Sequence, residues 1–363
     1  MRVVWISLSL VALAVRISPA SGTSMLQTSG AAATSPCANL PHSDHPKVTL
    51  IDGKMEAVVF LPDKDSGYYR STRFDWSGVV GCVAMNGHRF FGEWFENYDP
   101  LKNDAIVGPA EEFRTDDGVM GHHPPSSPLL TMQAEALGYD DAKPGDAFLK
   151  PGVGMLQRVS DKPYSFGTLY PIVNGGTWSI PRQTRKSITF QQVLNGSDGY
   201  AYVYTKTLLL DGQSSGLTLE HTLRNTGTRA IDTKVYDHDF FVFDGQPAGP
   251  GMVVRFKFEP KPVDPLGDRV RIEGKEIAFL KPVGRQAVSG YLTGYSSSPS
   301  DYDFTVEDTI RKVGVEQTSD TPISRIYFWS NGRAVCPEAY VHVPADPGQT
   351  SHWKIHYRFF TPS

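Results

Sequence analysis

The chain has 363 residues, of which 40% are hydrophobic and 20% are charged, and a formal net charge of −4. This composition is typical of a globular protein with a sizeable core. The sequence contains no run rich in Lys and Arg, so a nucleic acid or an anionic membrane is not an expected partner. The 34 glycines, 27 prolines and 11% aromatic residues favour many strands joined by turns over a helical bundle.

The first 20 residues are predicted to be a signal peptide. Met1-Arg2 gives a basic start, residues 3–15 are almost wholly apolar, and Ser18-Pro19-Ala20 offers small residues for cleavage. An uncleaved anchor is the alternative, although the apolar run is short for a bilayer. We therefore expect a secreted or periplasmic protein that has no membrane association after cleavage.

Residues 21–46 are dominated by small and polar residues and are predicted to form a flexible linker. The three cysteines, Cys37, Cys82 and Cys336, match no zinc-binding spacing. Two of them could pair after export, or Cys82 and Cys336 could be buried free thiols. The sequence leaves this choice open and gives no reason to expect a metal or a cofactor.

Residues 47–363 read as one all-β domain, a large antiparallel β-sandwich with few short helices. Residues 201–227 predict a hairpin around the turn at residues 211–216. Residues 353–359 alternate, which predicts a half-buried strand with Trp353, Ile355, Tyr357 and Phe359 on one face. The best short-helix candidate is residues 130–137.

Two segments resemble the galactose mutarotase (aldose 1-epimerase) superfamily. His238-Asp239-Phe240-Phe241 is similar to a strand end of that family that reads His-x-Tyr-Phe, and Cys336-Pro337-Glu338 is similar to its Cys-x-Glu element. A Pro347-Gly348 turn and a closing strand follow, as they do in the family. A looser likeness covers most of residues 47–363, but the family's Asn-x-Leu-His-Gly-Gly loop has no match.

The resemblance implies a supersandwich fold and an isomerase that interconverts sugar anomers without a cofactor. It implies that His238 is the general acid and Glu338 the general base. A base must take the proton of the C1 hydroxyl while an acid protonates the ring oxygen. We expect the two groups on opposite sides of the sugar, with Asp237 and Asp239 raising the pKa of His238.

Further side chains are predicted to bind the sugar. The family's arginine corresponds to Arg73 or Arg70, and His123 lies at a place comparable with the family's second histidine. Lys150 either lines the pocket or is exposed. Glu112 belongs to a segment dense in carboxylates and aromatics that is either a sugar-binding loop or a solvated one. Asp237 is a second carboxylate that is predicted to bind the sugar. The aromatic candidates for stacking on a sugar ring are Trp94, Trp178 and Trp329.

Two other functions remain open at this stage. The same scaffold could hold a carbohydrate without reacting with it, or it could belong to a polysaccharide lyase or hydrolase. A hydrolase would need two carboxyl groups about 5–9.5 Å apart, and a lyase would need a base with cations for a uronate. The expected partner in all three cases is a sugar or an oligosaccharide, whose identity the sequence does not give. The oligomeric state is unknown.

Overall fold

The computed structural model describes residues 34–115 and 136–362, together with Met1. Within these ranges no helix is long and apolar enough to cross a membrane. The helical elements described are two 3-10 turns, η2 (Phe243–Gly245) and η3 (Pro299–Asp301). The predicted signal peptide lies outside the described residues beyond Met1, as does the predicted helix at 130–137 apart from its last two residues.

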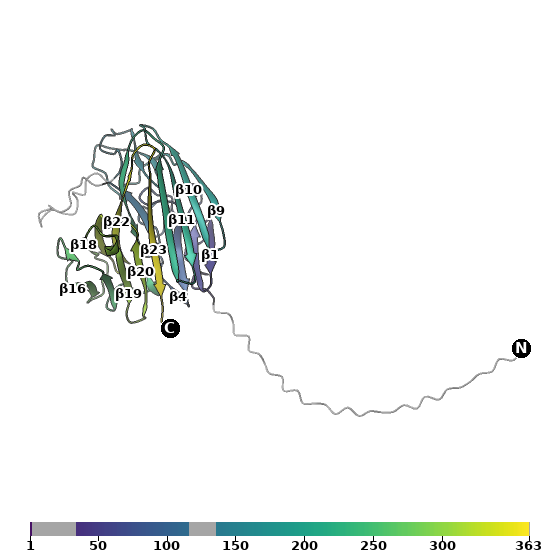
Figure 1. Cartoon of the computed structure of the whole chain (residues 1–363), viewed down its shortest axis with the longest axis vertical. Coiled ribbons are helices and arrows are strands. Elements are labelled where there is room, and N and C mark those ends of the chain that lie inside the picture. Colours follow the sequence, from purple (N-terminus) through teal and green to yellow (C-terminus); the bar gives the residue numbers. More distant parts are fainter. Residues whose placement is uncertain (2–33, 116–135, 363) are drawn as a thin grey trace, which may run out of the picture. The chain divides into compact units, whose positions relative to one another are not determined.

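The larger sheet has ten strands, all antiparallel to their neighbours, and Figure 1 shows several of them side by side. Across the sheet the order is β16 (Val270–Glu273), β17 (Glu276–Phe279), β14 (Met252–Phe256), β19 (Asp303–Asp308), β20 (Val313–Ser319), β23 (Thr350–Phe360), β12 (Gly216–Asn225), β11 (Ala201–Asp211), β10 (Ser187–Asn195) and β9 (Thr177–Gln183).

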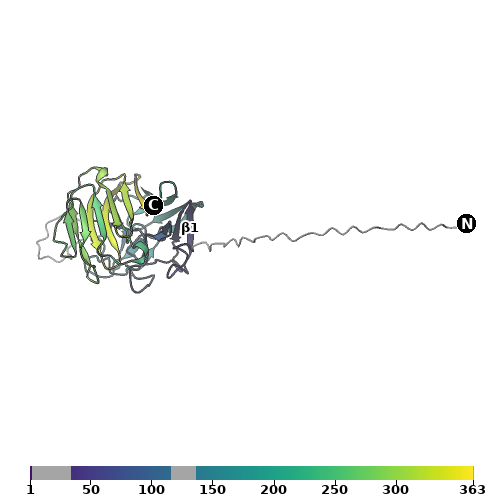
Figure 2. The same cartoon turned by 90° about the horizontal axis from the view of Figure 1, so that it is seen from below.

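The second sheet has six strands in the order β15 (Lys261–Pro262), β18 (Val288–Thr293), β21 (Arg325–Ser330), β22 (Val335–Ala345), β13 (Ile231–His238) and β5 (Ala110–Arg114). Two smaller sheets complete the fold. One contains β1 (Lys47–Asp52), β2 (Met55–Phe60), β3 (Val79–Met85) and β4 (His88–Arg89), and the other contains β6 (Ala147–Lys150), β7 (Gly154–Gln157) and β8 (Ile172–Asn174). Figure 2 shows the green and yellow strands in a row, with β1 away from them.

The inner faces of the two large sheets meet through buried side chains, which alternate with more exposed ones along β10, β11 and β23. Trp353, Ile355, Tyr357 and Phe359 of β23 are all buried, which confirms the predicted strand. Ring contacts join the sheets: Phe113 of β5 lies 6.0 Å from Trp353, measured between ring centroids. The predicted hairpin is also confirmed, because β11 and β12 pair from Tyr202↔Asn225 to Asp211↔Gly216. The all-β sandwich expected from the sequence is therefore present.

The N-terminal boundary of the folded unit differs from the predicted one. The unit begins at Ser35, not at residue 47. Cys37 forms a disulfide with Cys82 of β3, and both side chains are buried. His42 adds a contact to Glu93 at 2.9 Å. The disulfide attaches the second half of the predicted linker to β3. The polar composition of residues 21–46 did not predict this attachment.

Candidate active site in the six-stranded sheet

The pairing of β13 with β22 brings His238 and Glu338 together. The register sets Tyr236 opposite Tyr340, so two residues further along His238 lies opposite Glu338. Opposite residues of antiparallel strands project to the same face of a sheet. His238 Nε2 and Glu338 Oε1 are 3.3 Å apart, and the two residues are only 4% and 3% exposed. The expectation that the two residues lie on opposite sides of a sugar is wrong, because they are neighbours on one face of the six-stranded sheet.

Aromatic rings hold the imidazole of His238 in place. The ring of Phe240 stacks on it at 3.8 Å and 12°, and Trp94 stacks on Phe240 at 4.6 Å. Trp329 presses edge-on against the imidazole at 5.1 Å. These contacts bring two of the predicted stacking tryptophans, Trp94 and Trp329, to the pair.

The backbone at Phe240 is strained to make this stack. Its φ is 46°, a left-handed conformation that is a genuine outlier for a bulky residue. Its N–H donates to the sulfur of Cys336 at 3.2 Å, so the free buried thiol serves to anchor this backbone. His238 Nδ1 has no hydrogen-bond partner in the described part of the chain. The position of the imidazole therefore depends on its Nε2 contact and on the ring stack.

Glu112 binds three donors beside the pair. Arg73 Nε and Lys150 Nζ donate to its carboxylate at 2.9 and 3.0 Å, and the Tyr236 hydroxyl donates at 2.6 Å. Burial alone would raise the pKa of Glu112, but the charges of Lys150 and Arg73 hold it well below the usual range. Glu112 is therefore an ionised anchor for Arg73 and Lys150, and three of the predicted binding residues form one cluster.

Arg73 also contacts residues of the neighbouring loops. It also bonds Asp104 and donates to the Tyr236 hydroxyl at 3.1 Å. Its guanidinium stacks between the rings of Phe74 and Phe166, at 4.5 and 4.3 Å. Sequence reasoning overlooked Tyr236, although a residue two positions before His238 on a strand had to share its face.

The environment of the pair favours its uncharged form. Burial lowers the pKa of His238 well below its ordinary value, and the charges of Arg73 and Arg114 lower it further. Burial raises the pKa of Glu338 to about 8, against the opposing charge of Arg73. Both shifts favour a protonated Glu338 carboxyl beside a neutral imidazole over an ion pair between the two groups.

The prediction that Asp237 and Asp239 raise the pKa of His238 is wrong, because that pKa is lowered. Strand alternation turns them to the opposite face, between the two sheets, where both contact the hydroxyl of Tyr357. Burial and neighbouring acids raise the pKa of both, so neither supplies a charge that would keep His238 protonated. The predicted binding residue Asp237 therefore lies in the core between the sheets, on the face opposite to that of His238.

Two other predicted residues are not joined to the cluster. His123 lies outside the described residues. Trp178 is on β9 in the ten-stranded sheet, and no ring contact within the described ranges joins it to His238 or Glu338. Within residues 34–115 and 136–362, no group of three or more His, Cys, Asp or Glu side chains could hold a metal ion.

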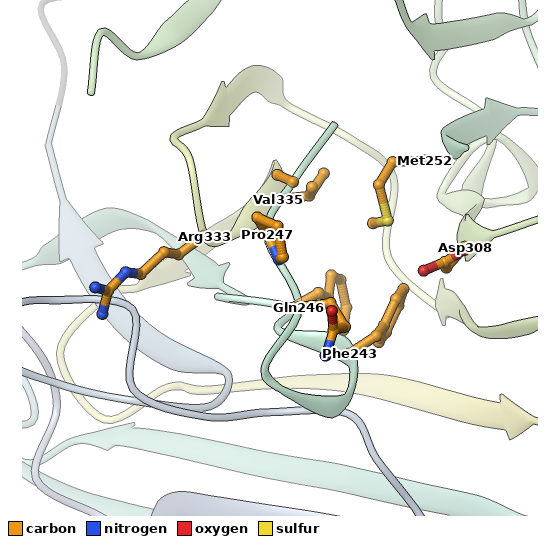
Figure 3. Close-up of a pocket in the computed structure, with 9 residues that line it drawn as sticks. Phe243, Gln246, Pro247, Met252, Asp308, Arg333 and Val335 are labelled. Carbon is orange, nitrogen blue, oxygen red and sulfur yellow. The ribbon is translucent and has the colours of Figure 1, made fainter. Parts of the chain in front are cut away.

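A small pocket near the end of β13 is separate from this site. It is lined by Phe241, Phe243, Gln246, Pro247, Ala248, Met252, Asp308, Arg333 and Val335. In Figure 3 the side chain of Arg333 extends away from Met252 and Asp308. The Asp308 carboxylate already binds the side chain of Arg311 and the N–H of Ile310. The pocket therefore offers no acid–base pair, and the His238–Glu338 pair is the better candidate for chemistry.

Comparison with known proteins supports the fold. No family model and no curated protein match the sequence. Among solved structures, a galactose mutarotase-like protein from Clostridium acetobutylicum aligns with a TM-score of 0.53 at 10% identity, over 89% of this chain and 98% of that one. A galactose mutarotase related enzyme from Lactobacillus acidophilus aligns with a TM-score of 0.50 at 12% identity, over 87% and 97%. An aldose epimerase homologue from C. elegans gives 0.50 and 12%, over 87% and 99%. The chain therefore has the galactose mutarotase-like fold.

Proposed function

We propose that the protein is an aldose 1-epimerase-like isomerase of an exported compartment, with His238 and Glu338 as its acid–base pair. The observation that carries the proposal is the 3.3 Å contact between His238 Nε2 and Glu338 Oε1, two buried groups whose pKa values are shifted toward their uncharged forms. The fold of the solved structures described above supports a sugar as the ligand. The Cys37–Cys82 disulfide supports export, because disulfides persist mainly in oxidising compartments.

Anomer exchange needs one proton given and one taken, and the pair can do both. The ring oxygen and the C1 hydroxyl are bonded to the same carbon, so two neighbouring groups on one wall can reach both. The pKa shifts favour the reverse of the roles that the resemblance implies: Glu338 donates to the ring oxygen while His238 accepts the proton of the C1 hydroxyl, and the hemiacetal C–O bond breaks. After rotation about C1–C2 the ring closes with the transfers reversed. Each positioned transfer contributes about 10²–10⁴-fold in rate.

The Arg73–Glu112–Lys150 cluster would hold the hydroxyls of the same sugar. Its charges are paired and buried, so it offers fixed donors and acceptors and not a mobile charge. A hydrolase is less well supported, because its second carboxylate must be free to act as base or nucleophile, whereas the Glu112 carboxylate is already bound by Arg73, Lys150 and Tyr236. A non-catalytic binding protein would not require an acid–base pair, and this separates it from the isomerase.

The test is anomer exchange followed by NMR on reducing sugars (galactose, glucose, fucose, uronic acids and short oligosaccharides). The wild type is compared with His238→Ala and Glu338→Gln, and Asp232→Asn on the exposed end of β13 is the matched control. We expect faster exchange for at least one sugar, lost in both site variants and kept in the control, while all variants remain folded by circular dichroism. Binding of a sugar without faster exchange would refute the isomerase and leave the binding protein.

A further inference from the structure

The wall that carries His238 and Glu338 continues toward the β18 edge of the six-stranded sheet. Tyr327 of β21 lies opposite Glu338, and Tyr291 of β18 lies opposite Tyr327. Residues that oppose each other in antiparallel strands project to one face. His238, Glu338, Tyr327 and Tyr291 therefore form one row across four strands.

Aromatic side chains dominate the far part of this row. The rings of Tyr291 and Tyr327 are 4.8 Å apart, and Trp329 lies two residues after Tyr327 on the same face. Arg325, on that face as well, stacks its guanidinium over Tyr291 at 5.4 Å. Tyr291, Tyr327 and Trp329 are each only partly buried, unlike the fully enclosed Tyr236 and Tyr340 beside them.

Such side chains suit a carbohydrate. Tyr and Trp present a rigid flat surface with a polar tip, and ordering them costs little conformational entropy. Adjacent strands are about 4.8 Å apart, so Tyr327 is one strand spacing and Tyr291 two spacings from Glu338. The Arg73–Glu112–Lys150 cluster lies on the other side of the pair, toward β5.

We propose that Tyr327, Tyr291 and Trp329 form a subsite for the second and third units of an oligosaccharide whose reducing end lies at His238 and Glu338. The inference rests on the proposed function and names its substrate class: a reducing oligosaccharide and not a free monosaccharide. The Arg73–Glu112–Lys150 cluster would hold the reducing-end unit on one side of the His238–Glu338 pair. The remaining units would extend across β21 and β18 on the other side.

The experiment measures affinity against chain length by isothermal titration calorimetry. The probes are β-linked gluco- and galacto-oligosaccharides of one to four units, together with their borohydride-reduced forms, which cannot exchange anomers. We expect the affinity of the wild type for one of these series to rise with each unit up to three. In Tyr327→Ala and in Tyr291→Ala the ratio of trisaccharide to monosaccharide affinity falls about tenfold. Phe360→Ala, which removes a partly buried ring from β23 in the other sheet, keeps the wild-type ratio.

The failure of this subsite and the failure of the proposed function give different results. Glu338→Gln retains the length dependence if the subsite exists, because it removes only the reacting carboxyl. Length-dependent binding without anomer exchange in the wild type refutes the isomerase and supports the subsite. Anomer exchange with an affinity that does not depend on length in either series refutes the subsite, and so does an unchanged ratio in both tyrosine variants.

Discussion

Asp237→Asn should stabilise the protein near neutral pH. Asp237 and Asp239 both contact the hydroxyl of Tyr357, which has one hydrogen and can donate to only one of them. The other contact needs a proton on a carboxyl group. Burial and the charge of Glu111 raise the pKa of Asp237 to about 8, in agreement with this count. The folded chain therefore keeps a proton here that the unfolded chain releases.

The size of the effect follows from the two pKa values. The unfolded value is about 3.9, so the penalty is absent below about pH 4 and grows by about 1.4 kcal/mol per pH unit as the pH rises toward the folded value. At pH 7 it reaches about 4 kcal/mol, which is an upper limit for the gain in Asp237→Asn because the amide must replace the hydrogen bond with Tyr357. We expect a gain of about 2–4 kcal/mol at pH 7 and none at pH 4.

The assay is urea unfolding at pH 4, 5, 6, 7 and 8, followed by tryptophan fluorescence. Asp232→Asn is the matched control, since Asp232 lies on the same strand with an exposed side chain. Its stability should differ from that of the wild type by no more than about 0.5 kcal/mol at every pH. If Asp237→Asn is no more stable than the wild type at pH 7, Asp237 is ionised in the folded chain, paired with the charge of Lys206, and the reasoning fails.

Four further outcomes are expected. The rate of anomer exchange should fall about tenfold per pH unit above about pH 8, because Glu338 then loses the proton that the pair needs; a flat profile would contradict this assignment. Glu112→Gln should lower the free energy of unfolding by about 3–5 kcal/mol in urea, since it removes the carboxylate that the buried Arg73 and Lys150 both bind, and a loss below about 1 kcal/mol would contradict the cluster. Phe240→Leu should lower kcat about tenfold or more with little change in KM, because the imidazole loses its stack; an effect on KM alone would argue against this positioning role. Cys37→Ser should cost about 4 kcal/mol of stability, the loop entropy for a separation of 45 residues, and equal melting of reduced and oxidised wild type would refute this.

The sandwich and the two catalytic candidates were predictable because each depends on a local signal. Alternation along residues 353–359 marks a strand whatever its partners are, and the hairpin at residues 201–227 is a contact between neighbours in the sequence. His238 and Glu338 came from short motifs. Their contact could not be read from the sequence, because the register of β13 against β22 joins residues 100 positions apart.

The N-terminal boundary and the protonation of the pair could not be predicted, for physical reasons. A disulfide orders a segment whose own composition is that of a linker, so the pairing of Cys37 with Cys82 overrides the local signal. A pKa depends on burial and on charges brought in by other strands. The charges of Arg73 and Arg114 act on His238 from elsewhere in the fold, whereas the adjacent Asp237 and Asp239 project to the opposite face of the sheet and do not raise its pKa.

The position of these residues on strand β13 explains why the two aspartates do not raise the pKa of His238, because neighbouring residues of the strand project to opposite faces of the sheet. Tyr236 and His238 project to the face that carries Glu338, and Asp237 projects into the core against Glu111, which lies 2.6 Å from His221. The core thus holds two acids with raised pKa values, Asp237 and Asp239, directly beneath the His238–Glu338 pair. Since the two sets lie on opposite faces of one sheet, a change of charge at Asp237 should alter stability much more than the pH profile of exchange. A profile in Asp237→Asn that moves by a full pH unit would show that the faces are electrostatically coupled, and the core acids would then have to be counted as part of the active site.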